Sequence, residues 1–485
     1  MQCHEIIETA QVLRHGIPGV RHPHRSILTA FLRKTSMNNF RKLPSGESVV
    51  QNLPWKWGVQ GKIFIIGGLG FMFDAWDVTL NGALIPLVSA EWGLDRPTAA
   101  WLGTANLIGM AVGAFMWGTI ADKIGRKKAF TWTLLIFSLF TVAGAMAPNF
   151  EWFVACRFLA GVGLGGCIPV DYALVGEFTP AKQRGRVLTA MDGWWPVGAA
   201  LSFFISGWVQ ATTGNWRLIL AVMVLPALLV FWIRRSVPES PLYLVRQGQR
   251  DEASKVIDDL VKRTGAPEQQ YTLPEPGKAP RLSAGSWLEQ LVKVWKFNPK
   301  ITMVAWALFL SILTVYYLAL TWMPSILADS GMAQSTAFFM TAVMALMGLL
   351  GVAIAALLVE RVGRKWLLAV TGPLSAFILV SVALSLNASN VALAWLLAFG
   401  VVVQIAIPVL YAYVSELYPT ELRGSGFGWA SSFSRLGAGF GPLLFAAWWP
   451  VIGLANLFLI AGALVLVAVI LMAFFAPETK GRALL

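Results

Sequence analysis

Four ionisable residues interrupt otherwise apolar stretches of the sequence: Asp74, Asp77, Arg157 and Arg435. An ionisable side chain at the centre of a bilayer costs about 2.5–3.5 kcal/mol on insertion scales, so we expect each of the four to have a function. Asp74 and Asp77 are three residues apart, which places both on one face of a helix as a coupled pair of titrating groups. Carboxyls are the expected proton carriers, because all four histidines lie in the N-terminal tail.

Arg435 has no acidic neighbour in the sequence. A guanidinium is a planar fork of donors that matches a carboxylate in a bidentate pair. We therefore expect Arg435 to bind the carboxylate of a small anion. The alternative is a buried link to Asp192, Asp171 or a helix carbonyl.

The elements that carry these residues are long and apolar. Hydrophobic residues make up 56% of the 485 and charged residues only 13%, against about 25% charged in soluble proteins. Stretches of about 20 apolar residues can cross a bilayer core as helices, and their continuity excludes alternating barrel strands. We predict an all-α membrane protein with twelve spans, at 63–89, 98–121, 128–147, 151–177, 186–209, 215–234, 301–326, 334–359, 365–386, 389–417, 424–446 and 449–474.

Basic residues predict the orientation of these spans. They gather in the connections 2–3, 4–5 and 8–9, whereas residues 147–151, 387–389 and 447–450 hold no Lys or Arg. By the positive-inside rule both termini are cytoplasmic. The net charge of +13 then mostly reflects the orientation of the chain in the membrane, so no nucleic-acid partner is expected.

The second half of the chain repeats the first at an offset of about 239 residues, which indicates two related bundles. Glu177-Phe-Thr-Pro returns as Glu416-Leu-Tyr-Pro, and Pro238-Glu-Ser returns as Pro477-Glu-Thr. We predict the following domains: a disordered basic tail (1–61), a six-helix bundle (62–234), a cytoplasmic linker with short helices (235–300), a second six-helix bundle (301–475) and a cytoplasmic C-terminal tail (476–485).

The sequence offers no basis for an enzyme or a metal centre. The three cysteines are Cys3, Cys156 and Cys167, and they show neither metal-ligand spacing nor a disulfide framework. We find no nucleophile triad and no phosphate-binding loop. We therefore expect no catalytic residues and no cofactor, with the proton as coupling ion.

Several motifs resemble those of one family. Gly118-x-x-x-Asp122-Lys-x-Gly-Arg126-Lys resembles the loop signature of the major facilitator superfamily, and Pro238-Glu-Ser-Pro and Pro477-Glu-Thr-Lys-Gly resemble its sugar-porter branch. Within that branch, residues 73–78 and 433–442 look most like bacterial niacin transporters and related organic-anion carriers. The resemblance covers about 62–482 and implies two bundles that alternate access to a central site.

The resemblance also gives roles to the charges. In that fold the first and fourth helices line the central cavity, and with about 1.5 Å of rise per residue Asp77 and Arg157 lie at matching depths. They resemble the proton switch of sugar:proton symporters, with Asp74 as a second carboxyl. A static salt bridge is the alternative.

In the resembling fold helices 5 and 7 line the same cavity, which favours Trp195 and Tyr316 for stacking on a substrate ring. With 22 tryptophans in the chain, lipid-facing or interfacial positions remain the alternative. The complete predicted substrate site is Arg435, Tyr316, Trp195, Asp192, Asp171 and Gln404.

By resemblance, charges at the cytoplasmic ends form a network that latches the inner gate; simple solvation at the interface is the alternative. These residues are Asp122, Arg126, Glu177, Arg184, Glu360, Arg364, Glu416 and Arg423.

The amides with which sugar porters hold their hydroxyl-rich ligand are replaced here by Trp306 and Ala307, which favours a flat anion. We predict a monomeric, proton-coupled carrier of a small aromatic monocarboxylate such as nicotinate, in the cytoplasmic membrane. A sugar or polyol symporter, an efflux carrier and a non-transporting sensor remain alternatives.

Overall fold

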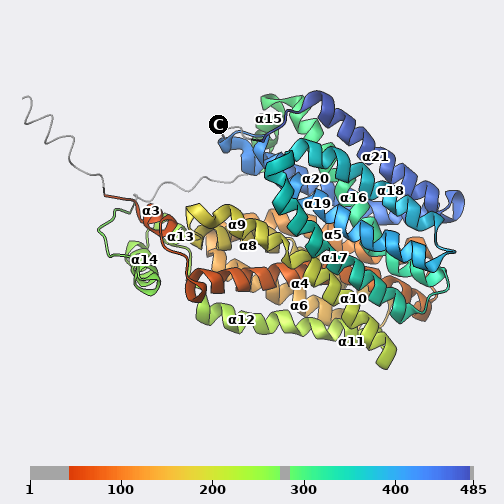
Figure 1. The fold of residues 1–485 in the computed structure, drawn as a ribbon. Coiled ribbons are helices and arrows are strands. Elements are labelled where there is room, and N and C mark those ends of the chain that lie inside the picture. Colours follow the sequence, from red (N-terminus) through yellow and green to blue (C-terminus); the bar gives the residue numbers. More distant parts are fainter. Residues whose placement is uncertain (1–42, 274–283, 481–485) are drawn as a thin grey trace, which may run out of the picture. The chain divides into compact units, whose positions relative to one another are not determined.

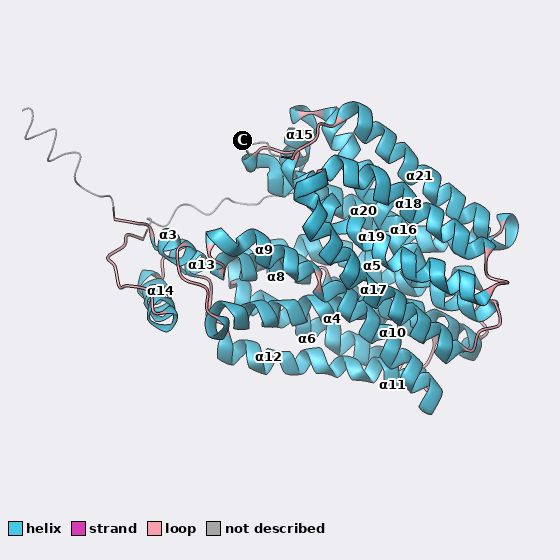
Figure 2. Ribbon diagram, in the orientation of Figure 1, coloured by secondary structure: helices cyan, strands magenta, loops and turns pink. Residues whose placement is uncertain are grey.

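The computed structural model describes residues 43–273 and 284–480, and the regular elements in these ranges are helices (Figure 2). Residues 43–45 and 270–272 belong to a separate unit, and every helix named below belongs to the other one. Residues 1–42 of the predicted tail and 481–485 of the C-terminal tail lie outside the described residues. Within the tail predicted to be disordered (1–61), residues 46–51 instead form α3 and residues 57–61 form the π-helical turn η1.

The first half of the chain contains long helices and helices broken into two pieces. They are α4 (Lys62–Trp92), α5 (Arg96–Ile124), α6 (Arg126–Ala145), α7 (Phe150–Leu164), α8 (Cys167–Phe178), α9 (Ala181–Asp192), α10 (Trp194–Thr212), α11 (Trp216–Ala221), η2 (Val222–Val224) and α12 (Leu225–Ser236). In Figure 1, α12 lies against α4 and α6.

Three shorter helices precede the second half: α13 (Pro241–Arg246), α14 (Arg250–Thr264) and α15 (Ala284–Phe297). The second half consists of α16 (Pro299–Asp329), α17 (Gln334–Val362), α18 (Arg364–Leu384), α19 (Ser389–Glu416), α20 (Thr420–Ile452) and α21 (Leu454–Phe475). Here α18 packs against both α19 and α21 (Figure 1).

Seven of the described helices are long and apolar enough to cross a membrane, by length and composition. The other predicted spans fall on helices that are either interrupted or less apolar. Gly165–Gly166 separates α7 from α8, Gly193 separates α9 from α10, and η2 separates α11 from α12. The predicted all-helical fold is therefore present, and the count of twelve spans stays a prediction.

Local sequence sets the helix ends. The Asp95 and Asn298 side chains each accept a hydrogen bond from the backbone three residues on, at the start of α5 and α16, and a proline follows each of them within two residues. The turns α5–α6 and α17–α18 are also alike, because Gly125 and Gly363 have φ of 99° and 107°, which few residues other than glycine adopt.

Glycines bring α5 and α7 into backbone contact. A Cβ added at Gly161 would lie 2.0 Å from the main-chain oxygen of Asn106, and one at Gly109 would lie 2.1 Å from that of Phe158. Small residues that let two backbones approach are typical of helix pairs in membranes. This packing places Arg157, on α7, opposite α4 and α5.

Candidate functional site

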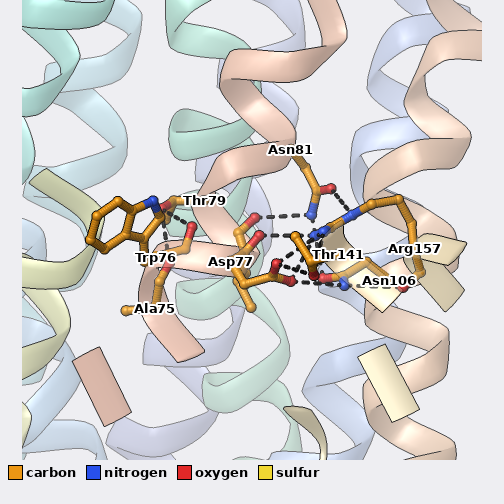
Figure 3. Close-up of polar contacts among 9 residues, drawn as sticks. Ala75, Trp76, Asp77, Thr79, Asn81, Asn106, Thr141 and Arg157 are labelled. Carbon is orange, nitrogen blue, oxygen red and sulfur yellow. Dashed lines mark hydrogen bonds and ion pairs between the residues drawn. The ribbon is translucent and has the colours of Figure 1, made fainter. Parts of the chain in front are cut away.

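Asp77 and Arg157 form a buried ion pair between α4 and α7 (Figure 3). Arg157 Nη1 donates to Asp77 Oδ1 at 3.0 Å and Nη2 donates to Oδ2 at 2.8 Å, the bidentate geometry that suits guanidinium and carboxylate. Nη2 also donates to the Asp77 main-chain oxygen at 2.9 Å. Both side chains are 0% exposed, so their charges depend on one another.

Three uncharged polar residues complete this pair. Thr141 Oγ1 donates to Asp77 Oδ1 at 2.7 Å, Asn81 Oδ1 accepts from Arg157 Nε at 3.0 Å, and Asn106 Nδ2 contacts Asp77 Oδ2 at 3.4 Å (Figure 3). The sequence prediction missed all three. A signal was available for Asn81, which lies four residues after Asp77 and so one turn further along the same face of the helix.

Asp74 and Asp171 present the opposite situation. Both are 0% exposed, and within the described residues none of their four carboxyl oxygens has a hydrogen-bond partner. A Cβ added at Gly70 would lie 3.0 Å from Asp171 Oδ2, so the Asp171 carboxyl lies over α4 one turn before Asp74. Asp74, from the predicted proton site, and Asp171, from the predicted substrate site, are therefore neighbours.

Tyr316 joins the two halves of the chain. Its hydroxyl accepts from Trp195 Nε1 of α10 at 3.1 Å and from Gln404 Nε2 of α19 at 2.7 Å. The Trp195 ring lies edge-on to Tyr317, with ring centroids 6.3 Å apart. Three of the predicted substrate residues, Tyr316, Trp195 and Gln404, are thus brought together.

Asp192 has a partner that the sequence prediction did not name. Tyr172 Oη donates to Asp192 Oδ1 at 2.5 Å, and Tyr172 packs edge-on against Phe71. The same Phe71 ring lies 5.4 Å from that of Trp195. The Asp192 carboxyl is therefore part of an aromatic cluster at the junction of α9 and α10.

Arg435 is partly buried on α20 and, within the described residues, makes no hydrogen bond or ion pair, so the alternative of a link to Asp192, Asp171 or a carbonyl is not observed. Its charge acts on Asp74, Tyr317 and Tyr411. A guanidinium without a hydrogen-bond partner among the described residues is suited to receive a planar anion.

The predicted gate residues form separate clusters in each half. Arg126 Nε lies 3.6 Å from Glu177 Oε1 in the first half, and Arg364 pairs with Glu360 and Glu416 in the second, at 2.5 and 3.1 Å. Arg184 and Arg423 instead donate to main-chain oxygens, those of Thr179 and Ser415. The Asp122 side chain lies outside the described residues.

Two glutamates outside the predicted site cap the helices α6 and α18, which begin beside these clusters. Glu239 accepts the backbone N–H of Lys127 at the start of α6, and Glu478 accepts those of Arg364 and Lys365 at the start of α18, at 3.0–3.1 Å. Both were visible in the sequence as members of the repeat. They serve as anionic caps at equivalent helix N-termini.

At the opposite end of the helices the two halves touch each other. Arg96, at the start of α5, pairs with Asp329, at the end of α16, and stacks on Trp449 with 4.2 Å from Cζ to the ring centroid. Thr104 Oγ1 donates to the Gly439 main-chain oxygen at 2.7 Å. A Cβ added at Gly82 of α4 would lie 2.3 Å from the main-chain oxygen of Leu320 of α16.

A family model described as Major Facilitator Superfamily matches residues 67–442 and 355–484. The chain belongs to the major facilitator superfamily. This transporter is 31% identical over 446 residues to the niacin transporter NiaP of Acinetobacter baylyi, covering 90% of the chain and 98% of that relative. It is 28% identical to a benzoate transport protein of the same species, over 81% of the chain and 83% of the relative.

The solved structures that resemble this one include a partially occluded inward-open form of the xylose transporter XylE from Escherichia coli. The TM-score is 0.70 at 19% identity, covering 88% of this chain and 99% of that one, which shows a common fold. The predicted family and the predicted likeness to niacin and aromatic-acid carriers are confirmed. The protein is a multi-pass membrane transporter rather than an enzyme.

Proposed function

We propose that this transporter takes up a small aromatic monocarboxylate, nicotinate first and benzoate-like acids second, together with protons. The observation that carries the proposal is Arg435, whose guanidinium has no hydrogen-bond partner within the described residues. A substrate carboxylate would supply the bidentate partner that this side chain lacks.

The cluster of Trp195, Tyr316 and Tyr317 supports a flat ring as the rest of the cargo. Tyr317 lies within reach of the Arg435 charge and contacts both Trp195 and Tyr316. The hydrogen bonds from Trp195 and Gln404 to the Tyr316 hydroxyl hold these rings in place. Edge-to-face or offset stacking on such rings contributes about 0.5–1.5 kcal/mol beyond the area buried.

Proton coupling is assigned to Asp77 and Arg157, with Asp74 nearby. Protonation of Asp77 would neutralise one member of a pair that is 0% exposed and would release Arg157 from it. The helices that carry the two residues, α4 and α7, could then change their packing. The coupling ion is the proton, and no other cofactor is part of the proposal.

In this mechanism the transporter is a monomer that crosses the cytoplasmic membrane twelve times, with both termini in the cytoplasm. The bundles are 62–234 and 301–475, joined by the linker 235–300. With that orientation the Arg96–Asp329 contact closes the outer side. The clusters around Glu177 and Glu416 then lie at the inner side, each within its own bundle, and alternating access exchanges contacts between the two sides.

Uptake of radiolabelled nicotinate into proteoliposomes with an acid exterior tests the proposal, in wild type, Arg435→Gln, Arg435→Lys and Asp77→Asn. Arg435→Gln should abolish uptake, and Arg435→Lys should restore part of it, because lysine keeps the charge and loses the fork. Arg217→Gln, at an exposed pair within one half, is the matched control. Absence of nicotinate uptake, with competition by hexoses for a different labelled cargo, would favour the sugar symporter instead.

A further inference from the structure

The transporter buries two kinds of carboxyl at its centre. Asp77 accepts hydrogen bonds from Arg157, Thr141 and Asn106, whereas Asp74, one turn away on the same helix, has no partner within the described residues. A buried carboxylate without a hydrogen-bond donor is costly, and a proton is the simplest ligand that removes the cost. The two acids of α4 therefore have different chemical tasks.

Asp171 adds a second unpartnered carboxyl to the same place. Its Oδ2 lies over Gly70, and Asp74 occupies the next turn of α4 on that face. The Asp74 charge acts on the Asp171 carboxyl. Two neighbouring buried acids rarely ionise together, so the site has a place for at least one proton.

Among the described residues, one cation acts on Asp74. Its titratable and charged surroundings comprise Asp77 on α4, Cys167 and Asp171 on α8, Tyr317 on α16 and Arg435 on α20. The helix α10, which also packs on α4, carries no titratable residue. The helices α5 and α9 carry titratable residues at Arg96, Asp122, Lys123, Lys182, Arg184, Arg186 and Asp192. Since Arg157 is committed to Asp77, Arg435 is the cation left to act on Asp74.

We propose that Asp74, with Asp171 beside it, is a second proton-binding site separate from the Asp77–Arg157 pair, and that its proton and the anion at Arg435 favour each other's binding. The inference rests on the proposed function, because it takes Arg435 as the anion site. An ionised Asp74 competes with the substrate carboxylate for the charge of Arg435. A neutral Asp74 leaves that charge to the substrate.

This linkage couples cargo to protons without any contact between them. Binding of the anion neutralises Arg435 and so favours a proton on Asp74, and by reciprocity the proton strengthens anion binding by the same factor. Coupling free energies between sites correspond to about 5–150-fold in affinity. The central site thus loads both ligands together.

The first test is nicotinate binding to the protein in nanodiscs over a pH series in which the ligand stays ionised. Wild-type affinity should rise about fivefold or more as the pH falls, with protons taken up in proportion to the anion bound. Asp74→Asn should bind tightly at every pH and take up no linked proton, and Asp171→Asn should weaken the pH dependence. Glu151→Gln, an exposed carboxylate on α7, should behave as wild type. An unchanged pH dependence in Asp74→Asn would overturn the proposal.

The second test does not depend on the cargo. The infrared carbonyl band of protonated carboxyls in the ligand-free protein should lose intensity in Asp74→Asn, and Arg435→Gln should leave more of Asp74 protonated at neutral pH. If nicotinate fails to bind wild type, the cargo assignment fails, and this band alone then tests the second proton-binding site. A band that is the same in wild type, Asp74→Asn and Arg435→Gln would disprove the second site.

Discussion

Arg157 holds Asp77 at three acceptor atoms, the two carboxylate oxygens and the main-chain carbonyl. The guanidinium therefore binds the backbone of α4 as well as the Asp77 carboxylate. Neutralising the carboxyl leaves one of the three contacts in place, so the pair can loosen while α4 and α7 remain connected.

Asp77→Asn should abolish gradient-driven accumulation and leave counterflow exchange of labelled substrate, because the amide mimics a permanently protonated carboxyl. Both activities are measured in the same proteoliposomes. Thr79→Ala is a suitable control, since among the described residues the Thr79 hydroxyl donates to main-chain oxygens of its own helix alone. Retention of proton-driven accumulation by Asp77→Asn would show that the pair is a static salt bridge.

Asn81→Ala should destabilise the transporter by about 1–3 kcal/mol, because it leaves the Nε of a buried guanidinium without an acceptor. The measurement is the apparent Tm in detergent. Asn81→Asp, which keeps an oxygen at this position, should recover part of the loss. Equal Tm values for wild type and Asn81→Ala would show that Arg157 finds another acceptor.

Tyr316→Phe should raise the Kd for the aromatic anion about two- to tenfold, which matches about 0.5–1.5 kcal/mol for a typical hydrogen bond. The ring remains, but the Trp195 indole and the Gln404 amide lose their shared acceptor and their fixed orientation. Tryptophan fluorescence on titration reports binding. Tyr413→Phe, whose hydroxyl contacts Pro477 far from the rings, should leave the Kd unchanged.

Asp329→Asn should shift the conformational equilibrium toward opening of the Arg96 side. The partners are nearly half exposed, so the shift corresponds to about 0.2–1 kcal/mol, at most about fivefold in population, and shrinks at high salt. Labelling rates of a cysteine placed between the halves report it. Glu91→Gln breaks an ion pair at the same end but within one half and should have no effect.

Glu478 gives a pH-dependent contribution to stability. Burial acts to raise its pKa, but backbone N–H groups of Lys480, Arg364, Thr479 and Lys365 together lower it below the ordinary value of 4.5. The contribution is therefore full above that value and is lost as the pH falls through the lower folded pKa. The Tm difference between wild type and Glu478→Gln should be constant near neutral pH and shrink in acid. A difference that grows in acid would contradict this assignment.

The sequence predicted the helices well because hydropathy is summed over long segments. It also identified Asp77 and Arg157, since charges in apolar helices are rare. It did not find Thr141 and Asn106, because uncharged polar residues are common in such helices and only the packing of α5 and α6 brings them to the pair.

The partners of the remaining charges depend on tertiary contacts that no spacing reveals. Asp192 is bound to Tyr172, and Arg435 is left without a hydrogen bond within the described residues, although the sequence allowed a link between them. The repeat did indicate the caps: Glu239 and Glu478 were both part of it, and their equivalent positions follow from the duplicated fold.

The backbone contact at Gly82 divides α4 unequally. Twenty residues separate it from the Lys62 end and ten from the Trp92 end, or about 30 and 15 Å at a rise of about 1.5 Å per residue. If the halves rock about this crossing with Leu320, it serves as the fulcrum of a lever with one long arm and one short arm. A small parting of the halves at the Arg96 rim would then sweep the opposite ends through about twice the distance.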